Sequence, residues 1–125
     1  MYYSHAMITY GTLCEKAEKR RIKARFANYK IIDPGRYEDN REKRRSGMNY
    51  CMRLIDDCDA LIFSRWNNSI TAGVGKEINH ALCKGMPVYE LRGRHIESVH
   101  KRVRYLPRDK TRQLYRRSKF NDRRK

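Results

Sequence analysis

Short apolar runs alternate with longer amphipathic stretches along the first three quarters of the chain. The clearest run is residues 60–63, which is apolar at every position, as expected of a strand that is buried on both faces of a parallel sheet. Three further short runs are typical of strands: residues 1–7, 29–32 and 86–91. The pattern therefore predicts a sheet with residues 60–63 at its centre.

Helical spacing of apolar positions fills the intervals between these runs. Thr12 and Glu15 form a capping-box pattern that opens a first helix. Apolar residues at helical spacing predict a second helix over 48–56 and a third over 73–84, whereas residues 36–46 are polar and predict a loop. Strands that alternate with helices over short connections predict an α/β fold with a mostly parallel sheet and right-handed crossovers.

The regular apolar spacing is lost in the last quarter of the chain. Residues 96–103 suggest one more docked helix, and much of 108–125 is expected to be disordered because it holds few apolar residues. We therefore divide the chain into one α/β domain, residues 1–92, and a basic C-terminal extension, residues 93–125, that is partly helical or disordered.

The composition suits one folded domain with a strongly basic surface. A chain of 125 residues, 39% of them apolar, is long enough to bury a core. Its formal net charge of +16 is unevenly spread, since residues 92–125 hold fourteen Lys or Arg against three Asp or Glu. Such a surplus favours polyanions: nucleic acid, anionic nucleotides or acidic membrane surfaces. A solvated basic extension with weak, non-specific affinity is the plain alternative.

The cysteines give no sign of a metal centre. Cys14, Cys51, Cys58 and Cys83 show neither a C-x-x-C pair nor a zinc-ligand spacing, so we expect reduced core thiols and no metal. A disulfide is the alternative if the protein comes from a hyperthermophile, because intracellular disulfides occur in such organisms. No apolar run approaches about 18 residues and no signal peptide is present, so we predict a cytoplasmic protein without a transmembrane segment.

A glycine-containing turn at the start of the third helix is the strongest candidate for a ligand site. Gly73 and Gly75 let the backbone approach a ligand closely, and the free N–H groups of a helix start favour anionic atoms. Glu77 lies about 60° from Val74 and 40° from Ala81 around the helix, beside its apolar face. Partial burial there would raise the pKa of Glu77, which the helix N-terminus opposes. Glutamate is also common in a first turn for electrostatic reasons alone.

Four segments follow the predicted strands and should meet at one edge of the sheet. Ser4 and His5 follow the first strand, Asp33 the second and residues 64–66 the third, and residues 71–77 open the helix after it. The carboxyl ends of parallel strands share an edge, and ligands of such sheets bind there. We therefore expect these side chains to surround a small-molecule site.

These residues resemble the nucleoside 2-deoxyribosyltransferase-like superfamily, which includes 2′-deoxynucleoside 5′-monophosphate N-hydrolases and CMP N-glycosidases. The resemblance covers residues 1–91. It rests on a small polar loop after the first strand, on Asp59 before the central strand, and on two motifs: Gly73-x-Gly75-x-Glu77-x-x-x-Ala81 and Gly85-x-Pro87-Val88. The resemblance implies a flavodoxin- or Rossmann-like three-layer sandwich with a mostly parallel sheet of four to five strands, extended by the basic C-terminal segment, and chemistry without a cofactor.

The resemblance also implies a reaction. In catalytic members the residue matching Glu77 attacks the anomeric carbon and forms a covalent glycosyl intermediate. Water then gives hydrolysis, and a second base gives transfer. Six residues before this glutamate, transferases carry aspartate and nucleotide hydrolases carry serine as a phosphate contact, so Thr71 favours a 5′-phosphate. Gly73 and Gly75 amides, with Ser4 and His5 from the first loop, would complete the phosphate site.

Other implied roles leave alternatives open. Trp66-x-x-Ser69 is similar to a pair that precedes the same glutamate in a group of small relatives, so Trp66 is a candidate for stacking on the base or for core packing. Relatives usually carry an aspartate where this chain has Cys51. Either another group such as Asp33 or Asp56 takes that role, or the chain binds nucleotides without turnover.

The partners follow from the same observations. A nucleotide or nucleoside is the expected small-molecule substrate, and relatives commonly form dimers that complete each other's sites, so the resemblance implies a homodimer or higher oligomer. A rival interpretation is a protein that contacts nucleic acid through residues 92–125. His5 and His80 are more typical of hydrogen-bonded or surface histidines than of catalytic ones.

Overall fold

The computed structural model describes the backbone of residues 1–38 and 40–124, and the side chains of this part of the chain through residue 118. Three parallel strands, β1 (Tyr2–Ser4), β2 (Leu61–Phe63) and β3 (Val88–Arg92), lie side by side, and β4 (His95–Val99) runs antiparallel to β3. The strand order is β1-β2-β3-β4. The predicted α/β fold with a mostly parallel sheet is confirmed, and β2 lies inside the sheet as expected.

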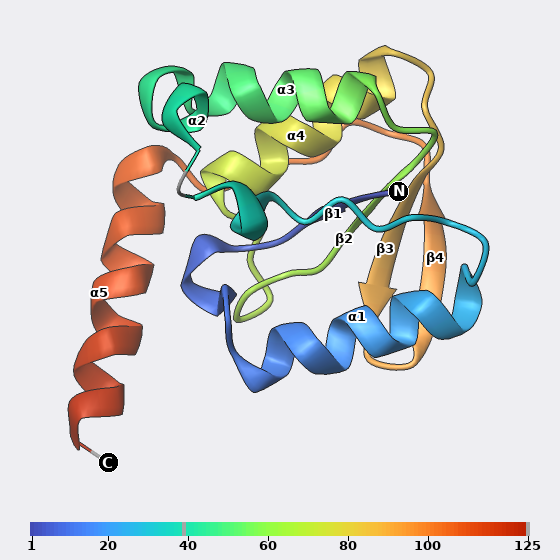
Figure 1. The fold of residues 1–125 in the computed structure, drawn as a ribbon. Helices are drawn as coiled ribbons and strands as arrows, with labels where there is room; N and C mark the ends of the chain where they lie inside the picture. Colours follow the sequence, from blue (N-terminus) through green and yellow to red (C-terminus); the bar gives the residue numbers. More distant parts are fainter. Residues whose placement is uncertain (39, 125) are drawn as a thin grey trace.

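Helices cover this open sheet in a Rossmann-like manner. Figure 1 shows α1 on one side of the strands and α3 with α4 on the other, while α5 stands at the side of the sheet. Within the described residues the helical elements are α1 (Leu13–Arg25), α2 (Arg41–Ser46), α3 (Met48–Asp56), α4 (Ala72–Cys83), α5 (Arg108–Arg124) and two 3₁₀ turns, η1 (Met7–Thr9) and η2 (Pro34–Tyr37).

The alternation of side chains along each strand divides the core in two. Tyr2, Leu61 and Phe63 pack with residues of α3 and α4, whereas Tyr3 and Ile62 point to the opposite face and pack with residues of α1. Successive strand residues point to opposite faces, so a strand of three residues supplies both cores. The apolar run over 60–63 is buried throughout, as its composition predicted.

The helix starts follow local capping rules. Thr12 Oγ1 accepts from the Glu15 N–H at 3.3 Å, so the predicted N-cap of α1 is confirmed. The return bond of a capping box is replaced, since the Glu15 carboxylate accepts from the Gly11 N–H at 3.3 Å and the Thr12 N–H donates to Thr9 O. The polar segment 36–46, expected as a loop, contains η2 and α2 instead. The Asn40 side chain caps α2 by accepting from the backbone N–H groups of Glu42 and Lys43. This helix start was missed because the whole segment is polar.

Two sequence predictions of regular structure are corrected. Residues 29–32 contribute a single bridge, Tyr2 with Ile32, because the Asp33 side chain closes a turn on the Gly35 N–H directly afterwards. The helix expected over 96–103 is wrong, since residues 95–99 form β4. A two-residue turn with Gly93 at φ +56° returns the chain from β3 into β4, which selects strand over helix.

The C-terminal segment is joined closely to the rest of the fold. The β3–β4 hairpin crosses the expected domain boundary at 92/93, and α5 replaces the disorder expected over 108–124; residue 125 lies outside the described residues. Asn79 of α4 brackets Val103 with two hydrogen bonds of 2.9 and 3.1 Å, and the Leu106 N–H donates to Ile70 O at 2.9 Å. Residues 103–111 are therefore fixed against α4.

The thiols and the helices bear on two further expectations. All four cysteines are free, but Cys14 and Cys83 are exposed, so the expectation of core thiols is wrong for these two. Among the described residues, no helix combines the length and the apolar character that a membrane crossing would require.

Candidate active site

A cavity of about 420 Å³ lies where the start of α4 faces α2, α3 and α5. This volume is within the usual range for small-molecule sites. Its wall combines apolar, aromatic and cationic side chains with one buried carboxylate. The principal lining residues are His5, Met7, Tyr10, Lys43, Met48, Cys51, Thr71, Gly73, Val74, Glu77, Arg108, Thr111, Arg112 and Tyr115.

Glu77 of α4 is the buried carboxylate, with an exposed fraction of 5%. Tyr2 and Ser4 lie two positions apart on β1, so both side chains point to the same face of the sheet. The Ser4 hydroxyl donates to Glu77 Oε1 at 2.7 Å, and the Tyr2 hydroxyl donates to Oε2. Both carboxylate oxygens are thus fixed by β1, and Ser4 holds the glutamate in place.

The protonation of Glu77 reflects two opposed effects. Burial raises the pKa of this carboxyl above its ordinary value and is the larger effect, whereas hydrogen bonds from Tyr2, Ser4 and Cys51 and the charge of Lys43 lower it. A buried carboxylate that is held by fixed hydrogen-bond donors loses few bound water molecules when it reacts with an electrophile. Glu77 is therefore suited to act as a nucleophile or as a base.

Cys51 of α3 lies beside Glu77 and lines the same cavity. Burial and the charge of Glu77 raise the pKa of the Cys51 thiol to about 11. The thiol is neutral near pH 7 and adds no second negative charge to the site. Asp56, weighed above as a replacement acid, pairs outside the cavity with His80 at 2.7 Å and with Lys84, and both partners lower its pKa.

The start of α4 offers backbone donors to the cavity. The first helical hydrogen bond runs from the Gly75 N–H to Thr71 O at 2.9 Å, so the three preceding amides have no acceptor inside the helix. The Ala72 N–H donates to Thr111 Oγ1 of α5 at 3.0 Å, and the Thr71 side chain caps none of the amides. The amides of Gly73 and Val74, both cavity residues, are thus placed for an anion.

Cations from α2 and α5 line the same cavity as these amides. Arg108 and Arg112 are four positions apart, about one helical turn, and both line the cavity. No acidic side chain pairs with either arginine in the part of the chain that the structure describes. Lys43, by contrast, pairs with Glu38 and donates to Pro34 O at 2.7 Å. The α5 arginines therefore supply most of the uncompensated positive charge of the site.

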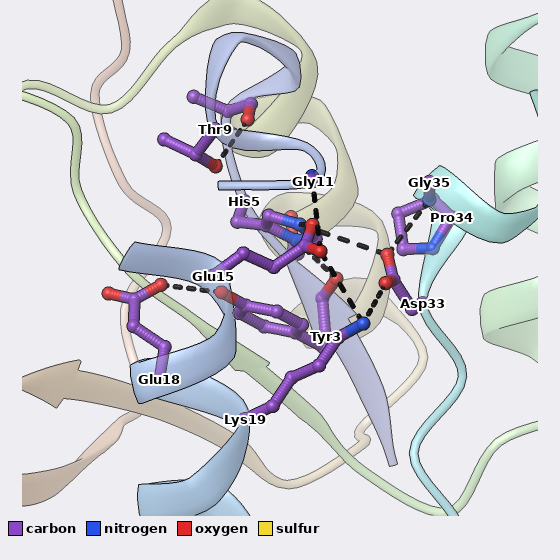
Figure 2. A network of polar contacts seen from close by, with 12 residues as sticks. Tyr3, His5, Thr9, Gly11, Glu15, Glu18, Lys19, Asp33, Pro34 and Gly35 are labelled. Carbon is purple, nitrogen blue, oxygen red and sulfur yellow. Dashed lines mark hydrogen bonds and ion pairs between the residues drawn. The ribbon is translucent and has the colours of Figure 1, made fainter. Parts of the chain in front are cut away.

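A second polar cluster lies behind His5, at the carboxyl end of β1 (Figure 2). His5 Nε2 is 2.7 Å from a Glu15 oxygen, and His5 Nδ1 is 3.0 Å from Tyr3 O. The ring is thus held between the Glu15 carboxylate and the Tyr3 carbonyl. Lys19 pairs with Asp33 and, at 3.5 Å, with Glu15. One lysine thus bridges two buried carboxylates.

This cluster also has the donor set of a metal site. One atom from each of His5, Glu15 and Asp33 lies within 4.8 Å of the others, and all three residues are buried. Lys19 already pairs with the other oxygen of each carboxylate, at 3.5 Å with Glu15 Oε1 and also with Asp33 Oδ2, so both carboxylates have a cationic partner from the chain itself. The arrangement is that of a buried network of ion pairs and hydrogen bonds, which fixes the loop after β1 to α1 and to η2.

The residues expected at the site separate into three groups. His5, Thr71, Gly73 and Glu77 line the cavity, and Ser4 and Asp33 lie directly behind it as partners of Glu77 and His5. Trp66, Ser69 and Gly75 lie outside the lining.

The three residues outside the cavity have structural roles here. Trp66 and Ser69 pair with each other through two backbone hydrogen bonds of 2.9 Å, across a turn whose two residues, Asn67 and Asn68, have positive φ. A Cβ on Gly75 would lie 2.2 Å from the Tyr105 ring, so this glycine permits close packing of the segment before α5.

Sequence reasoning missed the partners that tertiary contact supplies. Tyr2 could have been predicted as a site residue, because it lies two positions before Ser4 in a strand and so points to the same face. Arg108 and Arg112 could have been predicted together from their spacing of one helical turn. Thr111 and Tyr115 carry no local signal in the sequence, because their roles depend on contacts with α4 and η1. Burial raises the pKa of the Tyr115 hydroxyl, and the neighbouring Thr71, Met7 and Ile8 lower it.

Similarity supplies no independent guide to the chemistry of this cavity. Comparison of the chain with protein-family models, with characterised proteins and with solved structures finds no match.

Proposed function

We propose that the protein cleaves the N-glycosidic bond of a nucleoside 5′-monophosphate, with Glu77 as the nucleophile. The observation that carries this proposal is a buried carboxylate, fixed by Tyr2 and Ser4, in a cavity whose wall also holds helix-start amides and two α5 arginines without an acidic partner among the described residues. A glycosidic carbon needs a carboxylate beside it, and a 5′-phosphate needs cations and N–H donors. The cavity offers both.

The reaction follows from these positions. A Glu77 oxygen attacks C1′ of the sugar while the bond to the base breaks, and the base leaves with the bonding electron pair and takes a proton from the solvent. Water then attacks C1′ and loses a proton, and the ester bond to Glu77 breaks. The products are the free base and the sugar phosphate. A second base in place of water would give transfer.

The two ends of the substrate would meet different walls. The phosphate would lie near the Gly73 and Val74 amides and the side chains of Arg108 and Arg112. Tyr10 and Met48 offer the base an aromatic and an apolar surface. The three-layer arrangement and the dimer that the resemblance implies stay predictions, and light scattering of the purified protein would test the dimer.

The test is release of free base from a panel of ribonucleoside and deoxyribonucleoside 5′-monophosphates. Glu77→Gln is expected to lower the rate by about 10³-fold or more, because it removes the nucleophile while it keeps the shape of the side chain. Glu42→Gln, an exposed change on α2, is the matched control and should leave the rate within about twofold. No base from any substrate, or equal rates for both variants, would overturn the proposal.

A second function has one observation in its favour. Cys51 places a neutral thiol beside Glu77, at the position where the resemblance implies an aspartate. A protein that binds nucleotides without turnover would fit that feature. In that case nucleoside monophosphates would raise the unfolding temperature of the wild-type protein and release no base.

A further inference from the structure

The positive charge along α5 exceeds what one mononucleotide needs. Arg108 and Arg112 line the cavity, and with the free amides of α4 they already match one phosphate group. Arg116 lies one further turn along the same helix, is exposed and lies outside the cavity lining. In the described part of the chain no acidic side chain pairs with Arg116.

The three arginines form a row. Residues four apart on an α-helix lie on nearly the same face and are separated by about 6 Å along its axis. This spacing is close to the distance between successive phosphates of an extended nucleic-acid strand. Arg108 and Arg112 line the cavity and Arg116 does not, so the row runs from the cavity along α5, which stands at the side of the sheet (Figure 1).

From this arrangement we propose that the nucleotide in the cavity is one unit of a single-stranded polynucleotide, whose neighbouring phosphates bind the arginine row Arg108, Arg112 and Arg116. The inference rests on the proposed function, since it names the substrate class of the same cavity. A single strand can place an unpaired base in the cavity directly, whereas a duplex would first have to be opened. Tyr10 and Tyr115 supply aromatic surface in the cavity, as sites for single strands usually do.

Binding is tested with Glu77→Gln protein, which keeps the cavity and prevents turnover. Fluorescein-labelled single strands of about 12 nucleotides, one DNA and one RNA, are titrated at about 50 to 200 mM salt. The further change Arg116→Glu is expected to weaken binding about fivefold or more and to reduce the salt slope by about 1. Arg94→Glu, the same charge reversal in the β3–β4 turn, should change affinity less than about twofold. The DNA and RNA arms show which sugar is preferred.

A competition experiment locates the strand. The oligonucleotide is expected to displace a fluorescent nucleoside monophosphate from the Glu77→Gln cavity, and a duplex of the same sequence should displace it less well. Equal losses in the Arg116 and Arg94 variants, failure of the strand to bind, or equal displacement by the duplex would overturn the inference.

Base release separates this inference from the proposed function. Release from free nucleotides without strand binding overturns the inference alone. Strand binding at the arginine row without base release from any substrate overturns the proposed reaction alone.

Discussion

Glu77 combines burial with two fixed hydrogen-bond donors, and this combination ties its chemistry to the stability of the protein. Burial raises the pKa of the carboxyl in the folded state, while the unfolded chain gives it an ordinary value. Between these two pKa values the folded state holds a proton that the unfolded state has released. Stability therefore falls as pH rises through this window.

Replacing Glu77 by glutamine should remove this dependence. Glu77→Gln is expected to be more stable than the wild type near pH 7, by on the order of 1 kcal/mol, because it buries no charge. The difference should shrink toward acid pH, where wild-type Glu77 is protonated. Urea unfolding between about pH 4 and 8 measures it.

Comparison of the two pH profiles isolates Glu77 from other titrating groups. Asp56, whose pKa is lowered by Lys84 and His80, has the opposite dependence and contributes equally to both proteins. If the two curves of unfolding free energy against pH stay parallel over the whole range, the protonation of Glu77 does not affect stability.

At the scale of the element, α4 depends on two glycines with different surroundings. A Cβ on Gly75 would lie 2.2 Å from the Tyr105 ring, whereas a Cβ on Gly73 would meet the Met48 side chain at 3.5 Å, an ordinary contact. Both glycines have negative φ in the same helix, so alanine is compatible with the backbone at each. Alanine substitutions at the two glycines therefore distinguish the effect of close packing on stability from the effect of helix propensity.

Gly75→Ala is therefore expected to destabilise the protein by about 1 to 3 kcal/mol, because the Tyr105 segment must shift away from α4. Gly73→Ala should be neutral or stabilising by up to about 1 kcal/mol, since alanine favours helix over glycine. Thermal unfolding of both variants measures the difference. A Gly75→Ala protein as stable as Gly73→Ala would show that the segment before α5 is not held against α4.

Local sequence patterns predicted best the elements whose conformation depends on their own residues rather than on contacts with distant ones. The Thr12 N-cap of α1 and the apolar run of β2 follow from their own residues. β4 was missed because Ile96 and Val99 also fit helical spacing, and only the pairing with β3 chooses between the two. The same limit applies to the site: Glu77 stands in a motif, whereas Thr111 acquires its role through contact with the Ala72 amide.

The whole molecule carries a formal net charge of +16, and its buried charges contribute little to that excess. Lys19 pairs with the buried Asp33, and Glu90 pairs with Arg65 at 2.8 Å and with Arg92 at 3.1 Å. The surplus therefore resides in exposed side chains of α1, α2 and the last quarter of the chain, where like charges repel one another through solvent.

Added salt should accordingly stabilise this protein. Raising sodium chloride from about 0.02 to 0.2 M shortens the screening length below the spacing of most surface charges, and weakens buried pairs much less. We expect the unfolding temperature to rise by several degrees, equivalent to about 1 kcal/mol for a chain of this size. Sodium phosphate at equal ionic strength should add a further increase through binding in the cavity, and Arg112→Gln should reduce that increment. An unfolding temperature that falls with sodium chloride would mean that ion pairs such as Lys19 with Asp33 outweigh the repulsion among surface cations.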